Sequence, residues 1–302
     1  LIELGLIQGE LDESANLYAS ALKLSPTDEE TSVYFSQAKA RLPQLKERIA
    51  RRESQSDSMN YGNYFALLIG IDEYRYLQDL KTPVNDIRRL GSVLESDFGF
   101  DVRLLENATR ADILKGLSAL RRELGEQDNL LIYYAGHGFL DSDTDLGFWQ
   151  PSDSEAEDDL AWIPTNRVTK TLKGMKSNNI AVISDSCFAG TILRSGAVAT
   201  ETLDDSVLIQ KLVEKKTRVA FASGGLEPVP DNLSGGENSI FALNLISALK
   251  DSNRVTPAAN LFLTIQQNVI KTSAKLGFDQ SPEFSALYDS GHEGGDFIFV
   301  KK

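Results

Sequence analysis

The feature that most constrains the fold is an alternation of short apolar runs with longer amphipathic segments from residue 63 onward. Such alternation is typical of a mainly parallel β-sheet with helices on its faces. We expect strands near residues 64–71, 101–105, 129–135, 179–184, 217–223 and 296–300. We expect helices near residues 83–97, 109–124, 165–173, 239–250 and 257–275. The pattern therefore predicts an α/β fold built on a six-stranded sheet.

Two of the expected strands end in residues suited to covalent catalysis. Cys187, the only cysteine, follows the apolar run 180–183 in the stretch Asp185-Ser186-Cys187. His137 stands between two glycines after the run 130–135. A lone cysteine is more often an inert buried side chain, and a lone histidine is more often structural. Because a thiol needs a neighbouring base to become a nucleophile, the two motifs together favour a catalytic pair.

The combination resembles the caspase and metacaspase family (clan CD) of cysteine endopeptidases, in its prokaryotic form. The histidine precedes the cysteine by fifty residues, as in caspases. The resemblance covers residues 62 to 302 and includes the stretches Phe65-Ala66-Leu67-Leu68-Ile69-Gly70-Ile71-Asp72, Pro83-Val84-Asn85-Asp86, Tyr134-Ala135-Gly136-His137-Gly138, Asp185-Ser186-Cys187 and Gly294-Gly295-Asp296-Phe297-Ile298-Phe299. It implies the caspase-like fold, in which a mainly parallel six-stranded sheet is flanked by helices.

The resemblance also implies roles for individual residues. Cys187 would attack the peptide carbonyl, and His137 would protonate the leaving amine. The backbone N–H groups of Gly138 and Cys187 would form the oxyanion hole. Ser223 would border the substrate cleft and offer backbone contacts. No side chain stands out as a third residue that orients His137, and the family often works with a dyad. His292, the second histidine, is interpreted as non-catalytic.

Two acidic residues bear on which substrate residue precedes the scissile bond. Asp185 stands two residues before the cysteine, where animal caspases have glutamine, and Asp86 matches a second pocket acid of metacaspase-like members. Two carboxylates in one partly buried pocket repel each other unless a cation binds, so the pair predicts cleavage after arginine, with lysine as the second choice. The alternative is that Asp86 is a helix N-terminal charge and Asp185 a turn former.

Acidic residues also crowd the segment between Gly138 and Asn166, which contains no Lys, Arg or His. The run Asp141-Ser-Asp143-Thr-Asp145 fails the calcium-loop pattern of helix-loop-helix proteins at its later positions. Many metacaspases bind Ca²⁺ through loop aspartates, so Asp153, Asp158 and Asp159 are candidate ligands. A solvated acidic loop is the alternative. We expect no required cofactor, with Ca²⁺ as an option.

Composition limits the partners. The net charge is -13 and the pI is near 4.7, which argues against nucleic acid or an anionic membrane as a partner and favours basic protein substrates. No apolar run reaches the length of a membrane span, so we expect no membrane association. A single cysteine is typical of a reducing compartment, and we expect a cytoplasmic location.

The chain divides into three expected parts. Residues 1–52 resemble a tetratricopeptide-type helical segment that would bind a protein regulator, or else form a plain helical hairpin. Because the chain begins at Leu1, we expect further sequence upstream. Residues 53–62 would be a linker, and residues 63–302 the peptidase domain. That domain would comprise a large part (63–190), an internal linker (about 191–216) and a small part (217–302).

The internal linker is where caspase-like proteins are often cut during activation. Arg194 is the first candidate for self-cleavage, followed by Lys211, Lys215 and Lys216, and an uncut surface loop is the alternative. The sequence thus predicts a cysteine endopeptidase acting after basic residues and controlled by partner binding or self-cleavage. The alternative function is a catalytically silent caspase-fold scaffold, although both His137 and Cys187 are present.

Overall fold

The structure is a computed structural model that describes residues 59–186, 192–193, 206–224 and 237–302. The chain divides into two units, Leu1–Asn60 and Tyr61–Lys302. The expected tetratricopeptide-like segment lies outside the described residues, so its structure stays a prediction. Within the described residues, no helix combines the length and the apolar character that crossing a membrane requires.

A six-stranded sheet with the order β10-β8-β7-β3-β1-β2 forms the centre of the second unit. Five strands run parallel: β1 (Tyr64–Gly70), β2 (Asp101–Glu106), β3 (Asn129–Ala135), β7 (Asn179–Asp185) and β8 (Thr217–Ala222). The sixth, β10 (Glu283–Ala286), pairs antiparallel with β8. This confirms the predicted α/β fold with a mainly parallel sheet.

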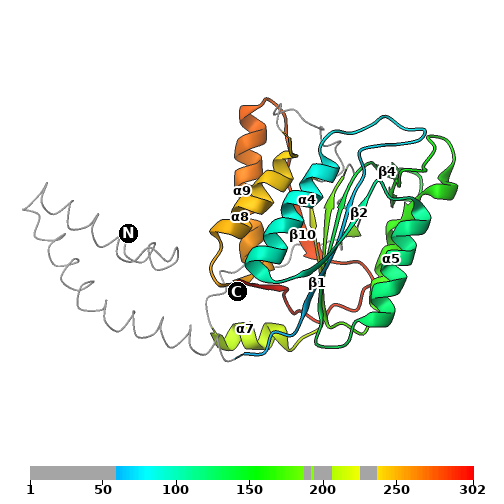
Figure 1. Ribbon diagram of the computed structural model, residues 1–302. Helices are drawn as coiled ribbons and strands as arrows, with labels where there is room; N and C mark the ends of the chain where they lie inside the picture. Colours follow the sequence, from blue (N-terminus) through cyan, green and yellow to red (C-terminus); the bar gives the residue numbers. More distant parts are fainter. Residues whose placement is uncertain (1–58, 187–191, 194–205, 225–236) are drawn as a thin grey trace, which may run out of the picture. The chain divides into compact units, whose positions relative to one another are not determined.

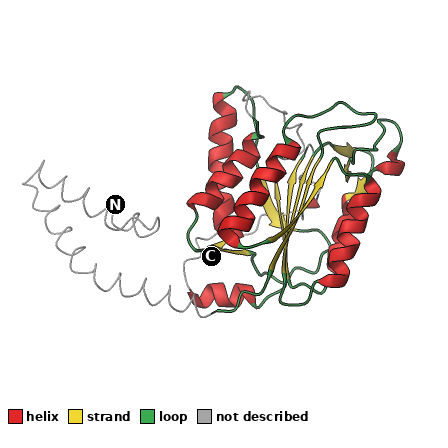
Figure 2. Ribbon diagram, viewed as in Figure 1, coloured by secondary structure: helices red, strands yellow, loops and turns green. Residues whose placement is uncertain are grey.

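Helices cover both faces of the sheet (Figures 1 and 2). On one face lie α4 (Pro83–Val93), which continues into a π-helical turn (Leu94–Phe98), α8 (Ile240–Asp251) and α9 (Ala258–Lys275). On the other lie α5 (Arg110–Glu123) and α6 (Thr165–Lys173). Each agrees with an expected helix to within a few residues. Helix α7 (Ser206–Val213) occupies part of the segment expected to be a flexible internal linker.

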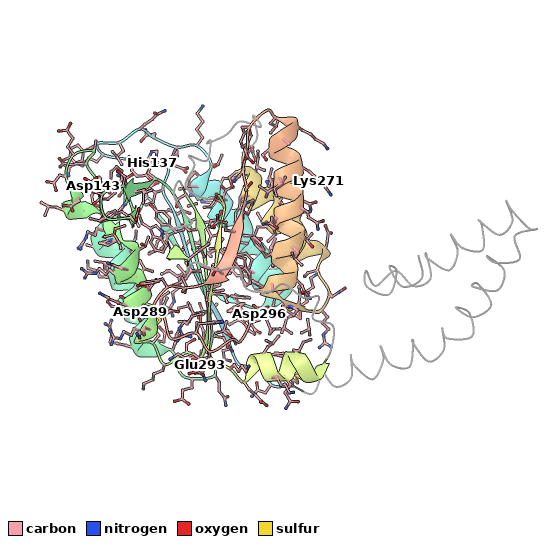
Figure 3. The ribbon with its side chains drawn as sticks, turned by 180° about the vertical axis from the view of Figure 1, so that it is seen from behind. His137, Asp143, Lys271, Asp289, Glu293 and Asp296 are labelled. Atoms are coloured by element: carbon pink, nitrogen blue, oxygen red, sulfur yellow. The ribbon has the colours of Figure 1, made fainter. Side chains whose placement is uncertain are left out.

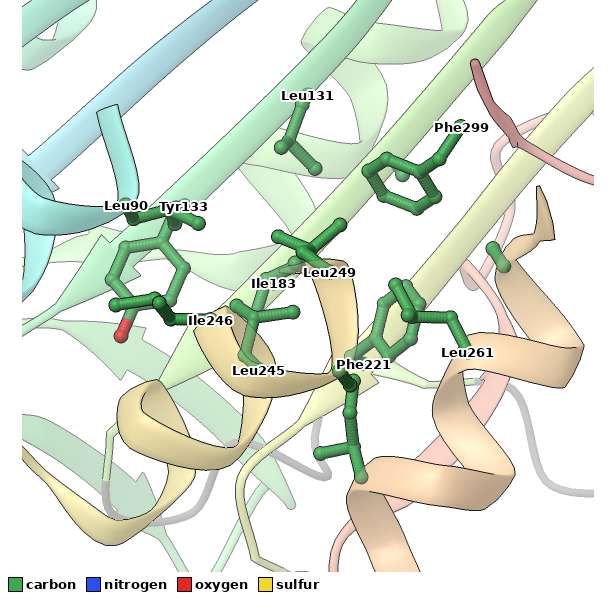
Figure 4. Close-up of a cluster of buried hydrophobic side chains, with 14 of the residues drawn as sticks. Leu90, Leu131, Tyr133, Ile183, Phe221, Leu245, Ile246, Leu249, Leu261 and Phe299 are labelled. Atoms are coloured by element: carbon green, nitrogen blue, oxygen red, sulfur yellow. The ribbon is translucent and has the colours of Figure 1, made fainter. Parts of the chain in front are cut away.

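The central strands β1, β3, β7 and β8 are largely buried on both faces, as parallel strands between helices must be, whereas the edge strand β2 is partly exposed. Successive residues of β3 therefore enter different cores: Leu131 and Tyr133 pack under α4, α8 and α9, whereas Leu130, Ile132 and Tyr134 pack under α5 and α6. Figure 4 shows the first of these cores, with Tyr133, Ile183 and Phe221 of the sheet beneath Leu245 and Leu249 of α8.

Two features differ from the expectation. The strand expected at 296–300 is β11 (Ile298–Val300), but it pairs with β9 (Val255–Pro257) in a separate two-stranded sheet, and β10 is the sixth strand of the main sheet. In addition, a three-stranded sheet follows His137 directly. It consists of β4 (Gly138–Asp141), β5 (Leu146–Trp149) and β6 (Ile163–Pro164), with a 3-10 turn (Asp159–Ala161) before β6.

Candidate active site

The carboxyl ends of β3 and β7 bring the two candidate catalytic segments side by side. The strands pair in register up to Ala135 and Asp185, and Gly136 N–H donates to Asp185 O at 3.4 Å. His137 follows β3 by two residues. Cys187 lies outside the described residues, but Ser186, which precedes it, directly follows β7. Neighbouring strand ends therefore carry His137 and the segment leading to Cys187.

His137 is held by two groups from the loop after β1. Its backbone N–H donates to Tyr74 Oη at 2.7 Å, and the two rings lie 4.7 Å apart. Its Nε2 lies 2.8 Å from the carbonyl oxygen of Gln78. Because a carbonyl oxygen can only accept, Nε2 must carry a proton. In the neutral ring Nδ1 is then the nitrogen able to take a proton.

Tyr134 joins the His137 loop to the rest of the site. Its hydroxyl lies 2.7 Å from His137 O and accepts the N–H of Gln150 at 3.1 Å. Its ring stacks on Trp149 at 4.5 Å, and Trp149 Nε1 donates to Ser184 Oγ at 3.3 Å. Ser184 Oγ is in turn 3.0 Å from Ser186 Oγ. Hydrogen bonds and stacking therefore link the two strand ends beneath the expected dyad.

Gly136 is the residue that lets the two tyrosines approach the loop. A Cβ at this position would lie 2.7 Å from Tyr74 Oη and 3.0 Å from Tyr134 Oη. Both distances are too short for ordinary packing, so any side chain would displace the hydroxyls that position His137. Gly138, the other flanking glycine, is the first residue of β4.

Asp86 and Asp185 lie together on the α4 and α8 side of the sheet, each almost fully buried at 1% and 8% exposure. One residue, Ser239, contacts both. Its backbone N–H donates to Asp86 Oδ1 at 3.2 Å, and its hydroxyl donates to Asp185 Oδ2 at 2.6 Å. Asn238 Nδ2 donates to Asp86 at 2.6 Å, and Tyr133 Oη to Asp185 at 3.0 Å.

This closeness has an electrostatic cost. Burial, and then the charge of Asp185, raise the pKa of Asp86 to about 7, although hydrogen bonds from Asn238 and Ser239 oppose the rise. Burial and the two carboxylates also raise the pKa of Tyr133 well above its usual range. A cation placed between the two acids would offset their repulsion by attracting both carboxylates. The arrangement is therefore suited to a buried guanidinium or ammonium group.

Ser223 lies at the end of β8, beside β7, but it is fully buried. Its N–H donates to Ser184 O at 2.9 Å, and its carbonyl accepts from Gln280 Nε2 at 2.9 Å. Its N–H is thus used to hold the sheet together, and the expected backbone contact between Ser223 and a substrate stays a prediction.

The three candidate calcium ligands do not form a common site. Asp153 Oδ1 accepts from Arg110 N–H at the start of α5, and Asp158 Oδ1 accepts from Leu160 N–H. Asp159 is an exposed residue of the 3-10 turn. Across the part of the chain that the structure describes, no three His, Cys, Asp or Glu side chains gather as metal ligands would. These residues do not fit a Ca²⁺ ion, and calcium dependence stays an untested expectation.

His292 lies at the opposite end of the sheet. Its Nδ1 accepts the backbone N–H of Arg218, the second residue of β8. Figure 3 shows the neighbouring Asp289 and Glu293 at one end of the domain and His137 at the other. A role in the same active site is therefore excluded by position, as the sequence indicated.

The candidate cleavage positions fall in different surroundings. Arg194 lies outside the described residues. Lys211 is in α7, and Lys215 and Lys216 form the turn between α7 and β8. Because peptidases bind extended segments, the helical Lys211 is the poorest of these three as a cleavage site.

The caspase domain family (peptidase C14) matches residues 63–289 of this chain. The chain belongs to that family, a family of cysteine-type endopeptidases, and the predicted resemblance is thereby confirmed. Among curated proteins it is 29% identical over 152 residues to metacaspase-1A of Aspergillus niger, covering 44% of this chain and 37% of the relative. It is 26% identical over 219 residues to metacaspase-1 of Botryotinia fuckeliana, covering 66% of this chain and 50% of the relative.

The caspase-domain fold is also seen in solved structures. Caspase-1 from Spodoptera frugiperda matches with a TM-score of 0.54 at 16% identity, over 80% of this chain and 91% of that one. Protein GSU0716 from Geobacter sulfurreducens matches with a TM-score of 0.52 at 17% identity, over 78% of this chain and 99% of that one. At these identities the likeness shows the fold alone. The chain spans half or less of the length of the two metacaspases above.

Proposed function

We propose that this caspase-domain protein is a cysteine endopeptidase that cleaves peptide bonds after arginine, and less readily after lysine. The observation that carries the proposal is the buried pair Asp86 and Asp185, joined by Ser239 beside the strand end that leads to Cys187. An arginine guanidinium can pair with both carboxylates through its planar set of donors, whereas lysine supplies one compact charge.

The catalytic steps follow from the groups at the strand ends. Cys187 Sγ, as the thiolate, attacks the carbonyl carbon after the basic residue, and the backbone N–H groups of Gly138 and Cys187 would receive the oxyanion. His137, with Nε2 bound to the Gln78 carbonyl, gives a proton from Nδ1 to the leaving amine. Water then takes the place of the thiolate on the acyl carbon, with His137 accepting its proton.

The test compares fluorogenic peptides that differ only in the residue before the scissile bond. We expect cleavage after arginine, weaker cleavage after lysine and none after aspartate. Cys187→Ala and His137→Ala should each lower kcat by at least about 10³-fold. His292→Ala, the change to the second histidine, is the matched control and should retain activity. Preference for aspartate would contradict the assignment of the pocket.

A scaffold without catalysis would be recognised by labelling. An arginine chloromethyl ketone should alkylate wild-type protein at Cys187 and leave Cys187→Ala unlabelled. Mass spectrometry of wild type and Cys187→Ala incubated without the ketone tests self-cleavage after Arg194, which should appear in the wild type alone. Adding a chelator to the peptide assay tests whether Ca²⁺ is needed. Control by a regulator bound to residues 1–52 stays part of the proposal.

A further inference from the structure

A second feature lies immediately beside His137, on the small sheet formed by β4, β5 and β6. Three aromatic side chains pack there into what we call the aromatic cluster, made of Phe139, Phe148 and Trp162. The ring centroids of Phe139 and Trp162 are 4.5 Å apart, and those of Phe148 and Trp162 are 5.5 Å apart. Phe139 and Phe148 are direct partners in the β4–β5 pairing.

The backbone pairing fixes where this cluster lies relative to His137. Gly138 pairs with Trp149, and the ladder continues one residue further because Gln150 N–H donates to His137 O at 3.0 Å. Alternate residues of a paired strand face the same side, about 7 Å apart along the chain. His137 and Phe139 therefore point to the same side of the small sheet. Phe139 is therefore the next side chain after His137 on this side of the small sheet.

One ring of the aromatic cluster is buried and held in place, and another is partly exposed. Trp162 is only 6% exposed, and its Nε1 donates to Glu155 O at 2.9 Å. Its own carbonyl accepts from Arg110 Nε at 3.3 Å. Phe139 lies against this anchored ring and is 38% exposed. Phe139 and the partly buried Phe148 thus present, on this fixed base, an apolar surface that another apolar side chain can cover.

The two sides of the sheet determine which part of a substrate reaches the cluster. Asp86 and Asp185 lie on the face covered by α4 and α8, where Tyr133 also points. The small sheet instead packs through Trp149 onto Tyr134, on the face covered by α5 and α6. Suppose that the side chain before the scissile bond binds between the two acids. The part of the substrate after the bond, whose amine His137 protonates, then extends toward the small sheet.

We infer that the aromatic cluster is the subsite for an apolar side chain of the substrate within two residues after the scissile bond. The inference rests on the proposed function, since it needs the bond to be cut between the acidic pair and His137. The distance of about 7 Å from His137 to Phe139 corresponds to two residues of an extended peptide. The side chain that binds the aromatic cluster thus belongs to the part of the substrate that leaves with the amine.

The charges around the cluster specify what should follow that apolar residue. The segment that carries the cluster, residues 139–166, contains many acidic residues and no Lys, Arg or His. The basic side chain of Arg110 also contacts the cluster, but it is part-buried and its Nε is bound to Trp162 O. The exposed acids of this segment are Asp143, Asp145, Glu155, Glu157, Asp158 and Asp159. Basic residues further along the leaving segment would be attracted to this rim, whereas acidic ones would be repelled. The preferred order is arginine, scissile bond, apolar residue, then lysine or arginine.

The experiment uses the full chain and internally quenched peptides that share an arginine at the cleavage point. The two residues after the bond are Gly-Gly, Phe-Gly or Gly-Phe, followed by Lys-Lys or Glu-Glu. We expect kcat/KM for the better phenylalanine peptide to exceed that for Gly-Gly by about fivefold to tenfold, because the exposed part of one aromatic ring is covered. The Lys-Lys series should exceed the Glu-Glu series, and added salt should narrow that gap.

The matched variants are Phe139→Ala and Ile270→Ala. Ile270 is a similarly exposed apolar residue, at 41%, on α9 on the other face of the sheet. Phe139→Ala should bring the preference ratio of phenylalanine over Gly-Gly close to one, and Ile270→Ala should leave that ratio unchanged. Phe139→Leu keeps an apolar surface and should give an intermediate ratio, which separates loss of the subsite from loss of the fold.

The outcomes distinguish the inference from the proposed function. Equal cleavage of the phenylalanine and Gly-Gly peptides by the wild type overturns the inference and leaves cleavage after arginine intact. A wild-type preference that survives in Phe139→Ala also overturns it. If none of these arginine peptides is cleaved, while the aspartate peptides of the specificity test are, the proposed function is wrong and the inference fails with it.

Discussion

Ser239 sets the state of both pocket acids with two different groups. Its N–H, fixed by the start of α8, donates to Asp86, while its hydroxyl donates to Asp185 and accepts the N–H of Ala242 as a helix cap. Donors of this kind favour the ionised carboxylate, yet burial and mutual repulsion still raise the pKa of Asp86 to about 7. Recognition of a cation should therefore depend on pH near neutrality.

Because the raised pKa leaves Asp86 protonated in the free protein below about pH 7, the preference for arginine over its neutral analogue citrulline should fall on acidification. Between pH 8 and pH 6 the ratio of their kcat/KM values should drop about tenfold. Using this ratio cancels the pH dependence of the chemical step, which both substrates share.

Asp86→Asn should lower the arginine preference by about 30-fold or more, since one partner of a buried charge contact is lost. The remaining ratio should vary little between pH 6 and pH 8. Asp101→Asn, a change at an exposed acid at the start of β2, is the control and should behave as the wild type. A wild-type ratio that stays level across this range would refute the assigned role of Asp86.

At this scale, motifs could indicate His137 and Asp185, which stand at or just after the ends of recognisable strands, and Asp86, which stands in the first turn of α4. Two other contacts had no such signal. Gln78 acts on His137 through its backbone carbonyl, which any residue would supply. Ser239 lies 54 residues after Asp185, and only the packing of α8 on the sheet brings the two together.

At the scale of elements, the backbone at the end of β3 determines where His137 lies. The backbone there must pass beneath Tyr74 and Tyr134, and only a glycine at 136 leaves room for both hydroxyls. The His137 loop therefore depends on a close backbone approach as much as on its hydrogen bonds.

Gly136→Ala should lower kcat for arginine peptides by about tenfold to 100-fold, because a misplacement of about 1 Å at the reacting groups is costly. KM should change less, since the acidic pair lies on the other face of the sheet. Gly125→Ala is the matched control, because a Cβ there meets only Asp128 Oδ2, at 3.6 Å. Equal effects of both changes on kcat would contradict this account.

Helices and strands with a clear hydrophobic pattern could be predicted from the sequence. Short strands that depend on pairing with a neighbour could not. Four of the five parallel strands, β1, β3, β7 and β8, are mainly apolar runs of six or seven residues, and α4, α5, α6, α8 and α9 have clear periodicity. Strand β10 has four residues, Glu283 to Ala286, and exists through its pairing with β8. The runs at 138–141 and 146–149 are equally short, so sequence alone gave no basis for the small sheet that carries Phe139.

At the scale of the whole molecule, buried acids make stability depend on pH. Asp296 is buried beside the start of α9, where it accepts the N–H groups of Ala259 and Phe297 at 3.0 and 2.8 Å. Burial raises its pKa to about 7 from an ordinary value of 3.8. The folded state thus favours the protonated acid, so the free energy of unfolding should fall as pH rises from about 4 to about 7.

For Asp296 alone, the free energy of unfolding should fall by on the order of 2 kcal/mol between pH 5 and pH 8. Asp86 should add to it, because its pKa is also raised. Chemical unfolding of the wild type and Asp296→Asn at both pH values measures the effect, with Asp101→Asn as the control. The difference between the two pH values should shrink in Asp296→Asn and persist in Asp101→Asn. An unfolding free energy for the wild type that rises toward pH 8 would rule this out.

Tyr133 and Tyr134 are consecutive residues, yet one hydroxyl reaches the acidic pair and the other reaches the His137 loop. A strand shifted by a single residue would send each tyrosine to the wrong side of the sheet. Specificity and catalysis would then be lost in the same folding error. Copies of this protein that assemble β3 incorrectly should accordingly be inert, rather than proteases with relaxed selectivity that could damage the cell.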